Sequence, residues 1–292
     1  MVVLITGSNS SLGKKLVDVL SKKYKILGSF NKKAHVIKKN KNISFKKINL
    51  EKEIKIKKSY KVKCVVHIAS RVPSDGNDYK NYDRNIRMTK NILKFIKKNK
   101  IKMLIFFSTM SVYGNHKKKI IKESYTSQID PTKLDYYARA KLDSEKLFLN
   151  YANKNKNFIL TIYRLCGIVG KNSKNNFLSN TLDKIKKNKL IYISNPNCLF
   201  NNVITNHNIA QILLKSIDFE KRNSIYNLAS KKPKVLKDVI KKIFIGLNKK
   251  VNISIVKSKK PFLISLKKKL IKNYNIYTVD KSIKQFINEN LE

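Results

Sequence analysis

The stretch TGSNSSLG, residues Thr6 to Gly13, separates the strand-like run VVLIT from the helical pattern LGKKLVDVLSKK. A turn of this kind cradles phosphate because backbone N–H groups and the helix N-terminus face the anion. Gly7 suits the tight turn, and Gly13 lets the helix pack closely on the sheet. Ser10 stands where a middle glycine is expected; its small side chain is tolerated, and its hydroxyl could donate to a phosphate oxygen. Glycine turns after strands are common, so the turn alone is explained equally by chance or by a dinucleotide-binding site, to which Gly7, Ser10, Ser11, Leu12 and Gly13 would belong.

Short β-branched or aromatic runs alternate with helical patterns over the first 165 residues. Strands are predicted at residues 2–6, 24–30, 42–50, 63–70, 103–110 and 157–165. Helices are predicted at residues 12–23, 51–59, 81–99 and 136–154. This alternation indicates βαβ units and a parallel sheet. The predicted fold class is α/β, with a Rossmann-like doubly wound parallel sheet in residues 1–170 and a smaller C-terminal α/β substrate lobe in residues 171–292, interleaved with the first.

The composition is that of a globular chain. Hydrophobic residues make up 42% of 292 residues, which allows a large core. The three cysteines are scattered without a CxxC pair, and no two histidines have metal-ligand spacing, so neither disulfides nor a metal are expected. His116 and His207 are interpreted as surface residues. Met1 leads directly into a strand without a leader, and no apolar run is long enough to cross a bilayer, so a cytoplasmic protein is expected.

The formal net charge of +47 has two explanations. One is a polyanionic partner, either a nucleic acid or an anionic membrane. The other is compositional drift, since Lys, Asn and Ile are inflated together and only six of the 65 basic residues are arginine. Nucleic-acid readers rely on arginine and interleaved aromatic residues, which the short lysine runs of this chain do not offer. Drift is favoured, so no nucleic-acid or membrane partner is expected, although one contiguous basic face would revive that hypothesis.

Two further motifs carry possible chemistry. In YYARAK, Tyr137 and Lys141 are four residues apart in a predicted helix and project from one face. The lysine ammonium is expected to lower the pKa of the phenol, so that the pair can move a proton to or from a hydroxyl or ketone. In STMSVYG, Thr109 ends a strand at the carboxyl edge of the sheet, where ligands of open α/β folds bind. Each motif alone is equally explained by an amphipathic helix or a polar strand end.

In their order and spacing, the three motifs resemble the extended short-chain dehydrogenase/reductase family, and within it the nucleotide-sugar epimerase/dehydratase branch. The resemblance covers nearly the whole chain. It extends to the segments HIAS (67–70), NIRMT (85–89), YRLCGIVG (163–170), FNNVITNHNIA (200–210), YNLAS (226–230) and TVDKSIKQF (278–286). It implies an enzyme that uses NAD(P) to transfer hydride at a carbon of a nucleotide-linked sugar.

The resemblance also implies roles for individual residues. Tyr137 is the acid/base, Thr109 the partner of the substrate hydroxyl, and Lys141 the residue that tunes Tyr137 and holds the cofactor ribose. Further cofactor contacts are implied for Asn31, Lys32, Asn49, Leu50, Ala69 and Asn85. Substrate contacts are implied for Ser70, Thr109, Ser111, Gly167 and Asn202. Arg164 is expected to be structural, and His67 to be packed beside the cofactor rather than catalytic.

Two departures from the family pattern bear on reaction and cofactor. Residues 110 and 111, Met and Ser, follow Thr109 where family dehydratases have acidic residues, so a 4,6-dehydratase is not expected and an epimerase or a 4-ketoreductase remains. The end of the second strand carries Asn31, Lys32 and Lys33 without a carboxylate. A carboxylate there would bind the ribose diol of NAD, so NADP is slightly favoured over NAD.

The substrate side departs as well. Asn201 and Asn202 stand where family members often have an arginine that grips the diphosphate, and Gly167 stands where a substrate-contacting asparagine is frequent. Either lysines hold the diphosphate, or the substrate is not a nucleotide sugar. Three functions remain open: a sugar-nucleotide epimerase or ketoreductase, a non-catalytic dinucleotide-binding sensor or scaffold, and a protein of nucleic-acid or membrane surfaces. A homodimer is also left open.

Overall fold

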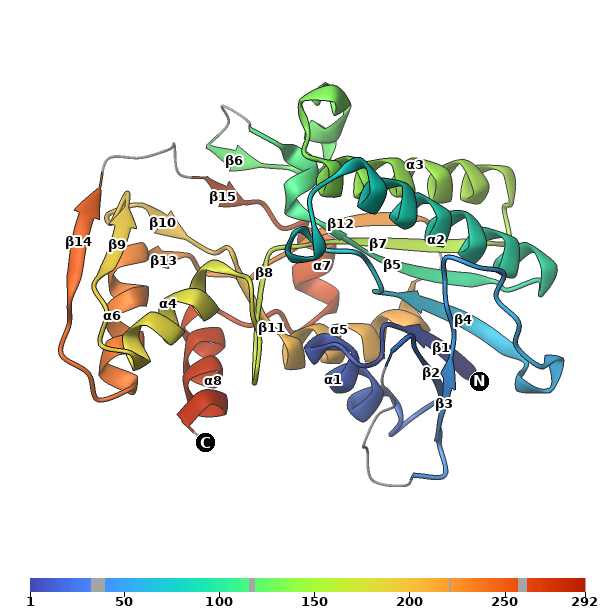
Figure 1. Cartoon of the computed structure of the whole chain (residues 1–292), viewed down its shortest axis with the longest axis horizontal. Helices are drawn as coiled ribbons and strands as arrows, with labels where there is room; N and C mark the ends of the chain where they lie inside the picture. The colour runs from blue at the N-terminus through green and yellow to red at the C-terminus, as the bar shows by residue number, and fades with distance from the viewer. Residues whose placement is uncertain (33–39, 116–118, 221, 257–261, 292) are drawn as a thin grey trace. The chain divides into compact units, whose positions relative to one another are not determined.

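The computed structural model describes residues 1–32, 40–115, 119–220, 222–256 and 262–291. Its first feature is a seven-stranded sheet with the order β12-β7-β5-β4-β1-β2-β3 (Figure 1). The strands are β1 (Val2–Thr6), β2 (Lys25–Phe30), β3 (Ile43–Lys47), β4 (Val62–His67), β5 (Met103–Thr109), β7 (Ile159–Leu165) and β12 (Ser224–Leu228). Neighbouring strands from β3 to β5 are parallel. The predicted α/β class with a Rossmann-like parallel sheet is confirmed.

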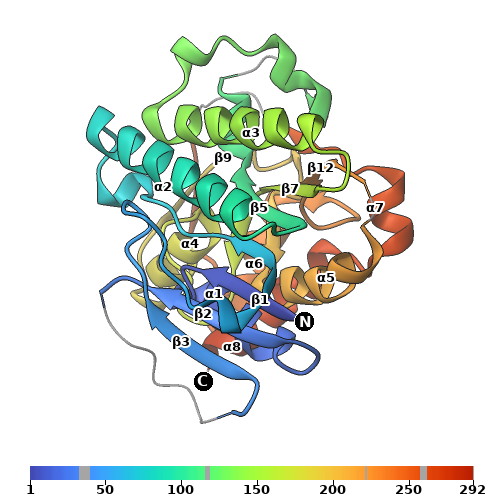
Figure 2. The same cartoon turned by 90° about the vertical axis from the view of Figure 1, so that its right-hand side faces the viewer.

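Helices cover both faces of this sheet because its strands are apolar on both sides. Helices α2 (Tyr79–Lys98) and α3 (Tyr136–Lys154) pack together on one face, and α1 (Ser11–Leu20) lies on the other (Figure 2). Leu4 and Leu104 from the strands and Ile92 and Phe148 from the helices belong to one buried core. Among the described residues, no helix is both long and apolar enough to cross a membrane.

The strand order reverses between β1 and β4, which brings two loops together. The chain first adds β2 and β3 on one side of β1, then builds β4 and β5 on the other. Ligands of open α/β sheets bind outside the carboxyl ends of the strands at such a reversal. Gly7 follows β1 and Ala69 follows β4, and a Cβ placed on Gly7 would lie 3.1 Å from the Ala69 backbone.

The chain divides into two compact units that are interleaved in sequence. The first comprises residues 1–115, 126–164 and 213–226, and the second comprises residues 116–125, 165–212 and 227–292. In the second unit the strands form four short pairs, β10-β13, β11-β8, β14-β9 and β15-β6. Their bounds are β6 (Ile120–Ile121), β8 (Gly167–Val169), β9 (Ile191–Ser194), β10 (Leu199–Phe200), β11 (Val203–Thr205), β13 (Lys234–Val235), β14 (Ile253–Val256) and β15 (Leu263–Ile264). The remaining helices are α4 (Phe177–Lys186), α5 (Asn206–Phe219), α6 (Leu236–Gly246), α7 (Lys268–Asn273) and α8 (Val279–Leu291).

One predicted element is wrong. The helix expected at residues 51–59 is an extended connection that contains only a short 3-10 turn, Lys58–Tyr60. Ile54 is buried in the core of the first unit, and Ile56 packs against it. These two isoleucines are two positions apart, which is the period of an extended chain and not of a helix. The long helices predicted at residues 81–99 and 136–154 are confirmed as α2 and α3.

Candidate active site

Two glycines shape the turn after β1, Gly7 by its backbone conformation and Gly13 by a close approach of two backbone segments. Gly7 has a φ of +69°, a left-handed conformation that favours glycine. A Cβ on Gly13 would lie 2.3 Å from the carbonyl oxygen of Gly7 and 2.8 Å from the Ser8 backbone. Helix α1 therefore begins in direct contact with the end of β1. This contact places the N-terminus of the helix, with its outward amide groups, at the carboxyl edge of the sheet.

Ser10 takes the place of the middle glycine without strain. Its φ of −68° and ψ of 162° are extended values that any residue adopts. Its Oγ accepts a hydrogen bond of 3.0 Å from the Gly13 N–H and donates one of 3.0 Å to the Gly7 carbonyl oxygen. Ser10 is thus the N-cap of α1, a position where serine is preferred. The hydroxyl that could have donated to a phosphate oxygen is here engaged within the turn.

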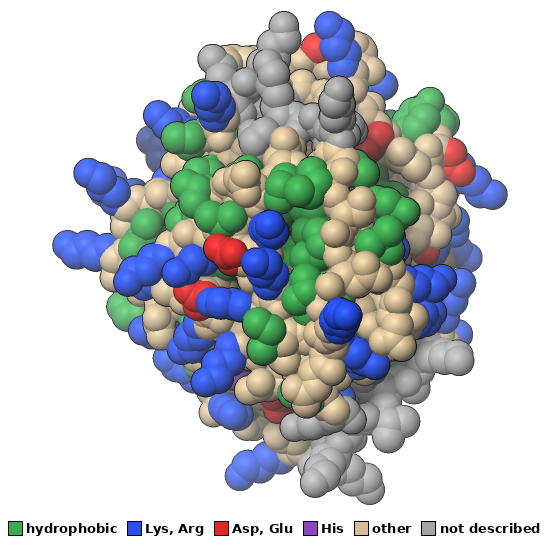
Figure 3. Space-filling view, turned by 90° about the vertical axis from the view of Figure 1, so that its left-hand side faces the viewer, with side chains coloured by type: hydrophobic (Ala, Val, Ile, Leu, Met, Phe, Trp, Pro, Cys, Tyr) green, Lys and Arg blue, Asp and Glu red, His purple; other side chains and the backbone are tan. Residues whose placement is uncertain are grey.

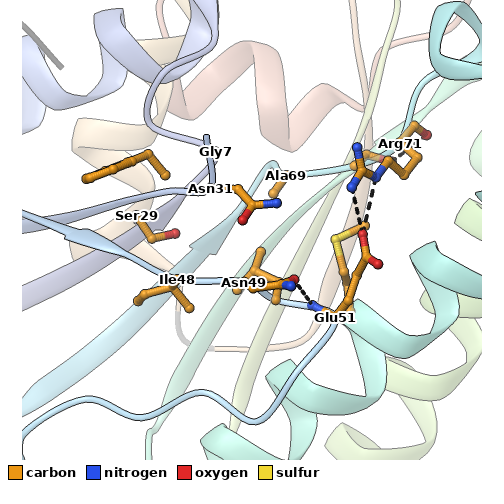
Figure 4. Close-up of a pocket in the computed structure, with 12 residues that line it drawn as sticks. Gly7, Ser29, Asn31, Ile48, Asn49, Glu51, Ala69 and Arg71 are labelled. Atoms are coloured by element: carbon orange, nitrogen blue, oxygen red, sulfur yellow. Dashed lines mark hydrogen bonds and ion pairs between the residues drawn. The ribbon is translucent and has the colours of Figure 1, made fainter. Parts of the chain in front are cut away.

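A cavity of about 140 Å³ lies at the carboxyl ends of β1 to β4 (Figure 4). Its lining includes six of the residues assigned from the sequence: Gly7, Asn31, Asn49, Leu50, Ala69 and Ser70. It also includes residues that were not assigned: Ser29, Phe30, Ile48, Glu51, Arg71 and Met88. Lys32 is exposed and does not line the cavity, and Lys33 lies outside the described residues. The structure therefore gathers six of the assigned residues at one place, and Lys32 is not among them.

Glu51 pairs with two arginines at this cavity. Its carboxylate oxygens lie 2.8 Å from Nη2 of Arg71 and 3.0 Å from Nε of Arg84. Burial alone would raise the pKa of Glu51, but the hydrogen bonds from Arg71 and Arg84 outweigh it and hold the pKa below its usual value. The Glu51 N–H donates to Oδ1 of Asn49 at 3.0 Å. Sequence reasoning missed this cluster because the arginines are 20 and 33 residues away from Glu51 along the chain.

Asn85 holds the loop that follows β4. Its Oδ1 accepts hydrogen bonds from the Arg71 N–H at 2.8 Å and from the Ser70 hydroxyl at 3.1 Å. Its Nδ2 donates to the Arg71 carbonyl oxygen at 3.0 Å. The amide that was expected to contact the cofactor is thus engaged with the loop, and Asn85 positions residues that line the cavity.

Thr109 and Tyr137 meet at the carboxyl end of β5. Thr109 is the last residue of that strand, Tyr137 lies in the first turn of α3, and the Thr109 side chain is near enough to the phenol of Tyr137 to lower its pKa. The Thr109 hydroxyl also donates to Oγ of Ser111 at 3.2 Å. The backbone N–H of Tyr137, which has no acceptor within the helix, donates to Oδ1 of Asn77 at 3.2 Å. The structure brings three predicted site residues together here, and adds Asn77, for which the sequence carried no signal.

Lys141 lies one helical turn after Tyr137, and its ammonium is directed at β5. Its Nζ donates to the carbonyl oxygen of Phe107 at 2.9 Å and lies 4.8 Å from the centre of the Phe106 ring. The side chain is buried, with 5% of the residue exposed. Burial lowers the pKa of Lys141 to about 7, although the nearby charge of Glu145 opposes the shift. Near neutral pH this ammonium therefore titrates.

The expected lowering of the Tyr137 pKa is not found in this structure. Burial raises the pKa of Tyr137 to about 12; the Thr109 side chain only partly opposes this, and the charge of Asp135 adds to it. The Lys141 ammonium does not offset the burial because it is bound at Phe107. Tyr137 is accordingly a protonated phenol, able to donate a proton or a hydrogen bond.

Arg164 is structural, as expected, and it fixes the helix that carries the candidate catalytic residues. Its Nη2 lies 2.6 Å from Oε2 of Glu145, with the two side chains only 2% and 1% exposed. Its Nη1 donates to the Tyr113 hydroxyl at 2.9 Å. Arg164 of β7 thus ties α3 to the turn that follows Thr109. Sequence reasoning missed Glu145, yet the spacing of Tyr137, Lys141 and residue 145 at successive turns was a usable signal.

His67 is a buried side chain that contacts β1. It is buried at the end of β4, and its Nδ1 lies 2.8 Å from the Thr6 hydroxyl. Burial, with a contribution from the charge of Lys141, lowers the pKa of His67 to about 3, so the ring is neutral. His207 is half-buried, with its ring centre 6.4 Å from that of Tyr277, and His116 lies outside the described residues.

In the second unit, Gly167 and Asn202 contact each other. The Gly167 N–H donates to Oδ1 of Asn202 at 3.3 Å, and a Cβ on Gly167 would lie 3.0 Å from the Asn202 carbonyl oxygen. The neighbouring Asn201 is buried and exchanges two hydrogen bonds with the Ile264 backbone, at 2.8 and 3.0 Å. Asn201 is therefore structural, which leaves Asn202 as the asparagine of this pair that is half-exposed.

Comparison with known proteins identifies the family of this chain. The family model described as the NAD dependent epimerase/dehydratase family matches residues 3–203. An N-acetyl-alpha-D-glucosaminyl-diphospho-ditrans,octacis-undecaprenol 4-epimerase from Escherichia coli is 25% identical over 171 residues, which is 58% of this chain. The aligned part spans half the length of that relative, at 50%.

Solved structures share the fold over nearly their whole lengths. The Bordetella bronchiseptica enzyme WbmH, in complex with NAD+, superposes with a TM-score of 0.80 at 15% identity, covering 100% of this chain and 98% of that one. The UDP-N-acetylglucosamine 4-epimerase from Methanobrevibacter ruminantium, in complex with UDP-N-acetylmuramic acid, gives 0.78 at 19% identity, with 99% and 97% covered. At these identities the structures show a common fold. Because the family model spans more than two thirds of the sequence, the chain belongs to the NAD dependent epimerase/dehydratase family.

Proposed function

We propose that this chain is an NAD(P)-dependent epimerase that acts on a sugar carried by a diphosphate, with Thr109, Tyr137 and Lys141 as its catalytic residues. The observation that supports the proposal is that Thr109, Tyr137 and Lys141 lie at the carboxyl end of β5, with the Lys141 ammonium 2.9 Å from the carbonyl oxygen of Phe107 in that strand. A hydroxyl pair there can bind and protonate one oxygen of a sugar. The buried Lys141 one turn further along α3 adds a group that titrates near neutral pH.

The protein groups divide the proton chemistry between them. When bound, the nicotinamide would take a hydride from a sugar carbon and return it. Tyr137 accepts the proton of the sugar hydroxyl as the ketone forms and donates a proton to the ketone oxygen as the hydroxyl is restored. Thr109 keeps that oxygen within reach of the phenol. Tyr137 is protonated in the free protein, so the oxidation step requires the pKa of Tyr137 to fall. A charged Lys141 that leaves the carbonyl oxygen of Phe107 and approaches the phenol would lower that pKa.

The turn and the cavity fit a dinucleotide. Gly7 gives the turn its left-handed backbone, and Gly13 lets α1 begin against the end of β1, since a Cβ on Gly13 would lie 2.3 Å from the Gly7 carbonyl oxygen. The start of α1 offers Ser11 and Leu12 amides to a pyrophosphate. Asn31, Asn49, Leu50 and Ala69 would surround the adenosine side, within the lining of the cavity. The two guanidinium groups around Glu51 and the exposed Lys32 give this end a positive balance, which favours NADP over NAD.

Epimerisation is favoured over dehydration because no carboxylate stands near Thr109 in sequence. Residues 110–113 are Met, Ser, Val and Tyr, and they form a 3-10 turn. A 4,6-dehydratase needs an acid for elimination, which this turn does not provide. A 4-ketoreductase would use the same catalytic set and differs only in releasing the product after one hydride transfer.

The substrate is proposed to be a nucleotide-linked sugar, with a polyprenyl-diphosphate-linked sugar as the second candidate. The second candidate rests on the Escherichia coli relative, whose name gives a diphospho-undecaprenol sugar as its substrate. It also suits the absence of an arginine at residues 200–207, where a nucleoside diphosphate would be gripped. Gly167 and Asn202 are proposed as further sugar contacts in either case.

The test is an epimerisation assay on both substrate classes. Purified protein with added NAD or NADP is incubated with UDP-N-acetylglucosamine or with N-acetylglucosamine on diphospho-undecaprenol, and the products are resolved by NMR. We expect C4 epimers from one class and none from the Tyr137→Phe variant. Dinucleotide binding without turnover on any sugar would instead support the non-catalytic sensor or scaffold.

A further inference from the structure

A cavity of about 280 Å³ lies at the amino-terminal edge of the sheet, away from the candidate active site at the carboxyl edge. It is found where β4 begins at Val62 and α2 ends at Lys98, at the right of Figure 1. Val62 and Phe95 line it as members of the buried core, so this part of the wall is fixed. The lining also includes six lysines: Lys57, Lys58, Lys61, Lys63, Lys98 and Lys100. We call these six residues the lysine cluster.

Acidic side chains hardly neutralise the lysine cluster. Residues 54–70 and 84–115, which contain all six lysines, have no Asp or Glu. Among the described residues, one member of the cluster forms an ion pair: Nζ of Lys98 lies 3.0 Å from Oε1 of Glu53. The hydrogen bond from Lys98, its charge and the charges of two further lysines hold the pKa of Glu53 below its usual value. The electrostatic field at this edge of the sheet is therefore positive.

Other surfaces of the protein mix the two charge signs. On the face shown in Figure 3, red Asp and Glu side chains stand among the blue Lys and Arg side chains. In the second unit, Lys234 and Lys242 both pair with Asp280. The lysine cluster differs from such a surface because, in the described part of the chain, five of its six cations face one cavity without a carboxylate partner.

Two members of the lysine cluster have a backbone conformation that lysine does not favour. The φ angle is +44° at Lys61 and +50° at Lys100. Such left-handed values suit glycine and, after it, asparagine. Of the eight other-than-glycine residues with positive φ in the described ranges, five are asparagine. Lysine at two such positions beside one cavity lowers stability, and outliers of this kind gather at functional sites.

The end of α2 explains only part of the lysine cluster. The carboxyl end of a helix carries about half of a negative elementary charge, which attracts cations. This partial charge is small against six lysines. Moreover, the lysines at residues 57, 58, 61 and 63 come from the segment that leads into β4 and not from the helix. The remaining positive charge is complementary to a bound anion.

We propose that the lysine cluster binds an anion made of linked phosphate groups, either an inorganic chain or the triphosphate of a nucleotide. Lysine binds phosphate as a point charge. The cavity is just smaller than the usual pockets for drug-sized ligands, about 300–1,000 Å³, which suits a short phosphate chain. A nucleic acid fits less well, because the described lining residues include no arginine and their aromatic member, Phe95, is buried. The inference does not depend on the proposed enzymatic function.

The test is titration calorimetry of the full chain with tripolyphosphate, ATP and inorganic phosphate. We expect tripolyphosphate to bind more tightly than phosphate, because it presents more charges to the cluster, and its affinity to fall as salt is added. Comparable binding of ATP would identify the triphosphate group of a nucleotide as a ligand. Binding of tripolyphosphate without ATP would identify an inorganic chain.

Replacements in the lysine cluster locate the site. Lys61→Asn with Lys100→Asn is expected to weaken tripolyphosphate binding by about tenfold or more. This variant should melt no lower than the parent, because asparagine tolerates left-handed backbone and repulsion within the cluster falls. Lys57→Gln with Lys58→Gln, which changes no left-handed position, should weaken binding similarly.

The matched control is Lys232→Asn with Lys250→Asn in the second unit. Both lysines are exposed, and Lys232 has a φ of +54°, so the control removes the same charge and also changes a left-handed position. It should bind tripolyphosphate nearly as tightly as the parent does.

Any of four results would overturn the proposal. Tripolyphosphate could bind no more tightly than inorganic phosphate. ATP could bind at the cluster while tripolyphosphate does not, which would make the nucleoside the ligand. The control variant could lose as much affinity as the cluster variants, which would show that only total charge matters. A single-stranded oligonucleotide could bind more tightly than tripolyphosphate and lose its affinity with the same replacements, which would assign the cavity to a nucleic-acid surface.

Discussion

The ammonium of Lys141 donates a 2.9 Å hydrogen bond to the carbonyl oxygen of Phe107, and both groups are buried. This lysine is stabilised by one neutral acceptor and the ring of Phe106, while the negative charge of Glu145, one turn on, is already bound to Arg164. Burial therefore dominates, and it lowers the pKa of Lys141 to about 7. A pKa shifted this far lowers the free energy of unfolding. Such shifts are characteristic of functional sites.

Lys141→Met is expected to stabilise the fold by about 1–3 kcal/mol at pH 7, because it removes a buried cation and keeps the side-chain volume. The unfolded chain holds the Lys141 proton up to the ordinary pKa of 10.5, whereas the folded chain releases it near 7. Between these values the unfolded state binds more protons, so the parent gains stability as pH rises. The gap between variant and parent should thus be largest at pH 7 and below and shrink towards pH 10. Thermal melts from pH 6 to 10 measure it, and a destabilised variant at pH 7 would contradict the burial argument.

Tyr137→Phe is expected to lower turnover by about 10²–10⁴-fold while leaving dinucleotide affinity nearly unchanged. The phenol moves a proton, and its removal leaves the turn after β1 and the cavity intact. Steady-state assays and cofactor titration report the two effects separately. Thr109→Val is the companion variant, since it removes the hydroxyl partner of Tyr137 at similar volume. Unaltered turnover in Tyr137→Phe would remove this residue from the mechanism.

The sequence predicted the fold, and the helix that carries Tyr137 and Lys141, better than it predicted the electrostatics around these two residues. Regular spacing sufficed for α3, because Tyr137 and Lys141 share a helical face in any helix. It did not suffice for their pKa values, because these depend on Phe107 and Glu145, which tertiary packing and the next helical turn bring to the lysine. The ion pairs of Glu51 with Arg71 and Arg84 could not be predicted from the sequence either, because the two arginines come from distant segments.

Arg164→Met is expected to destabilise the protein by about 3–5 kcal/mol, because it leaves the Glu145 carboxylate buried without its partner. The double variant Arg164→Met with Glu145→Leu should recover most of that loss, since a buried ion pair can be replaced by apolar side chains of similar size. Denaturant unfolding of the parent, both single variants and the double variant gives the coupling between the two sites. A double variant no more stable than Arg164→Met would show that Arg164 acts mainly through Tyr113.

Binding of NADP(H) is expected to be tighter than that of NAD(H), because residues 31 and 32 offer an amide and a cation at the end of β2 without a carboxylate. Titration calorimetry with both cofactors measures the difference, and Lys32→Ala should reduce it. Lys25→Ala, at the opposite end of the same strand, is the matched control. A preference for NAD(H) would show that Lys32 is merely solvated and that the arginines around Glu51 do not reach the cofactor.

Replacements of Ser10 separate its capping role from the space around the phosphate site. Ser10→Gly should cost only about 0.3 kcal/mol and Ser10→Ala about 1 kcal/mol, because the hydroxyl accepts the Gly13 N–H and glycine is a tolerable N-cap whereas alanine is not. Neither change should expel a dinucleotide, since the hydroxyl proton is directed at Gly7 and not outward.

Ser10→Leu should behave differently from both. Its stability should resemble that of Ser10→Ala, because residue 10 is exposed and the lost cap is the same. Its affinity for a dinucleotide should fall steeply, because a branched side chain at the start of α1 fills the space that a pyrophosphate needs. Thermal melting without ligand and titration with NAD or NADP measure the two quantities for all three variants. If Ser10→Leu bound the dinucleotide as tightly as Ser10→Ala, the phosphates would lie elsewhere, and the turn between β1 and α1 would have to be explained by helix capping alone.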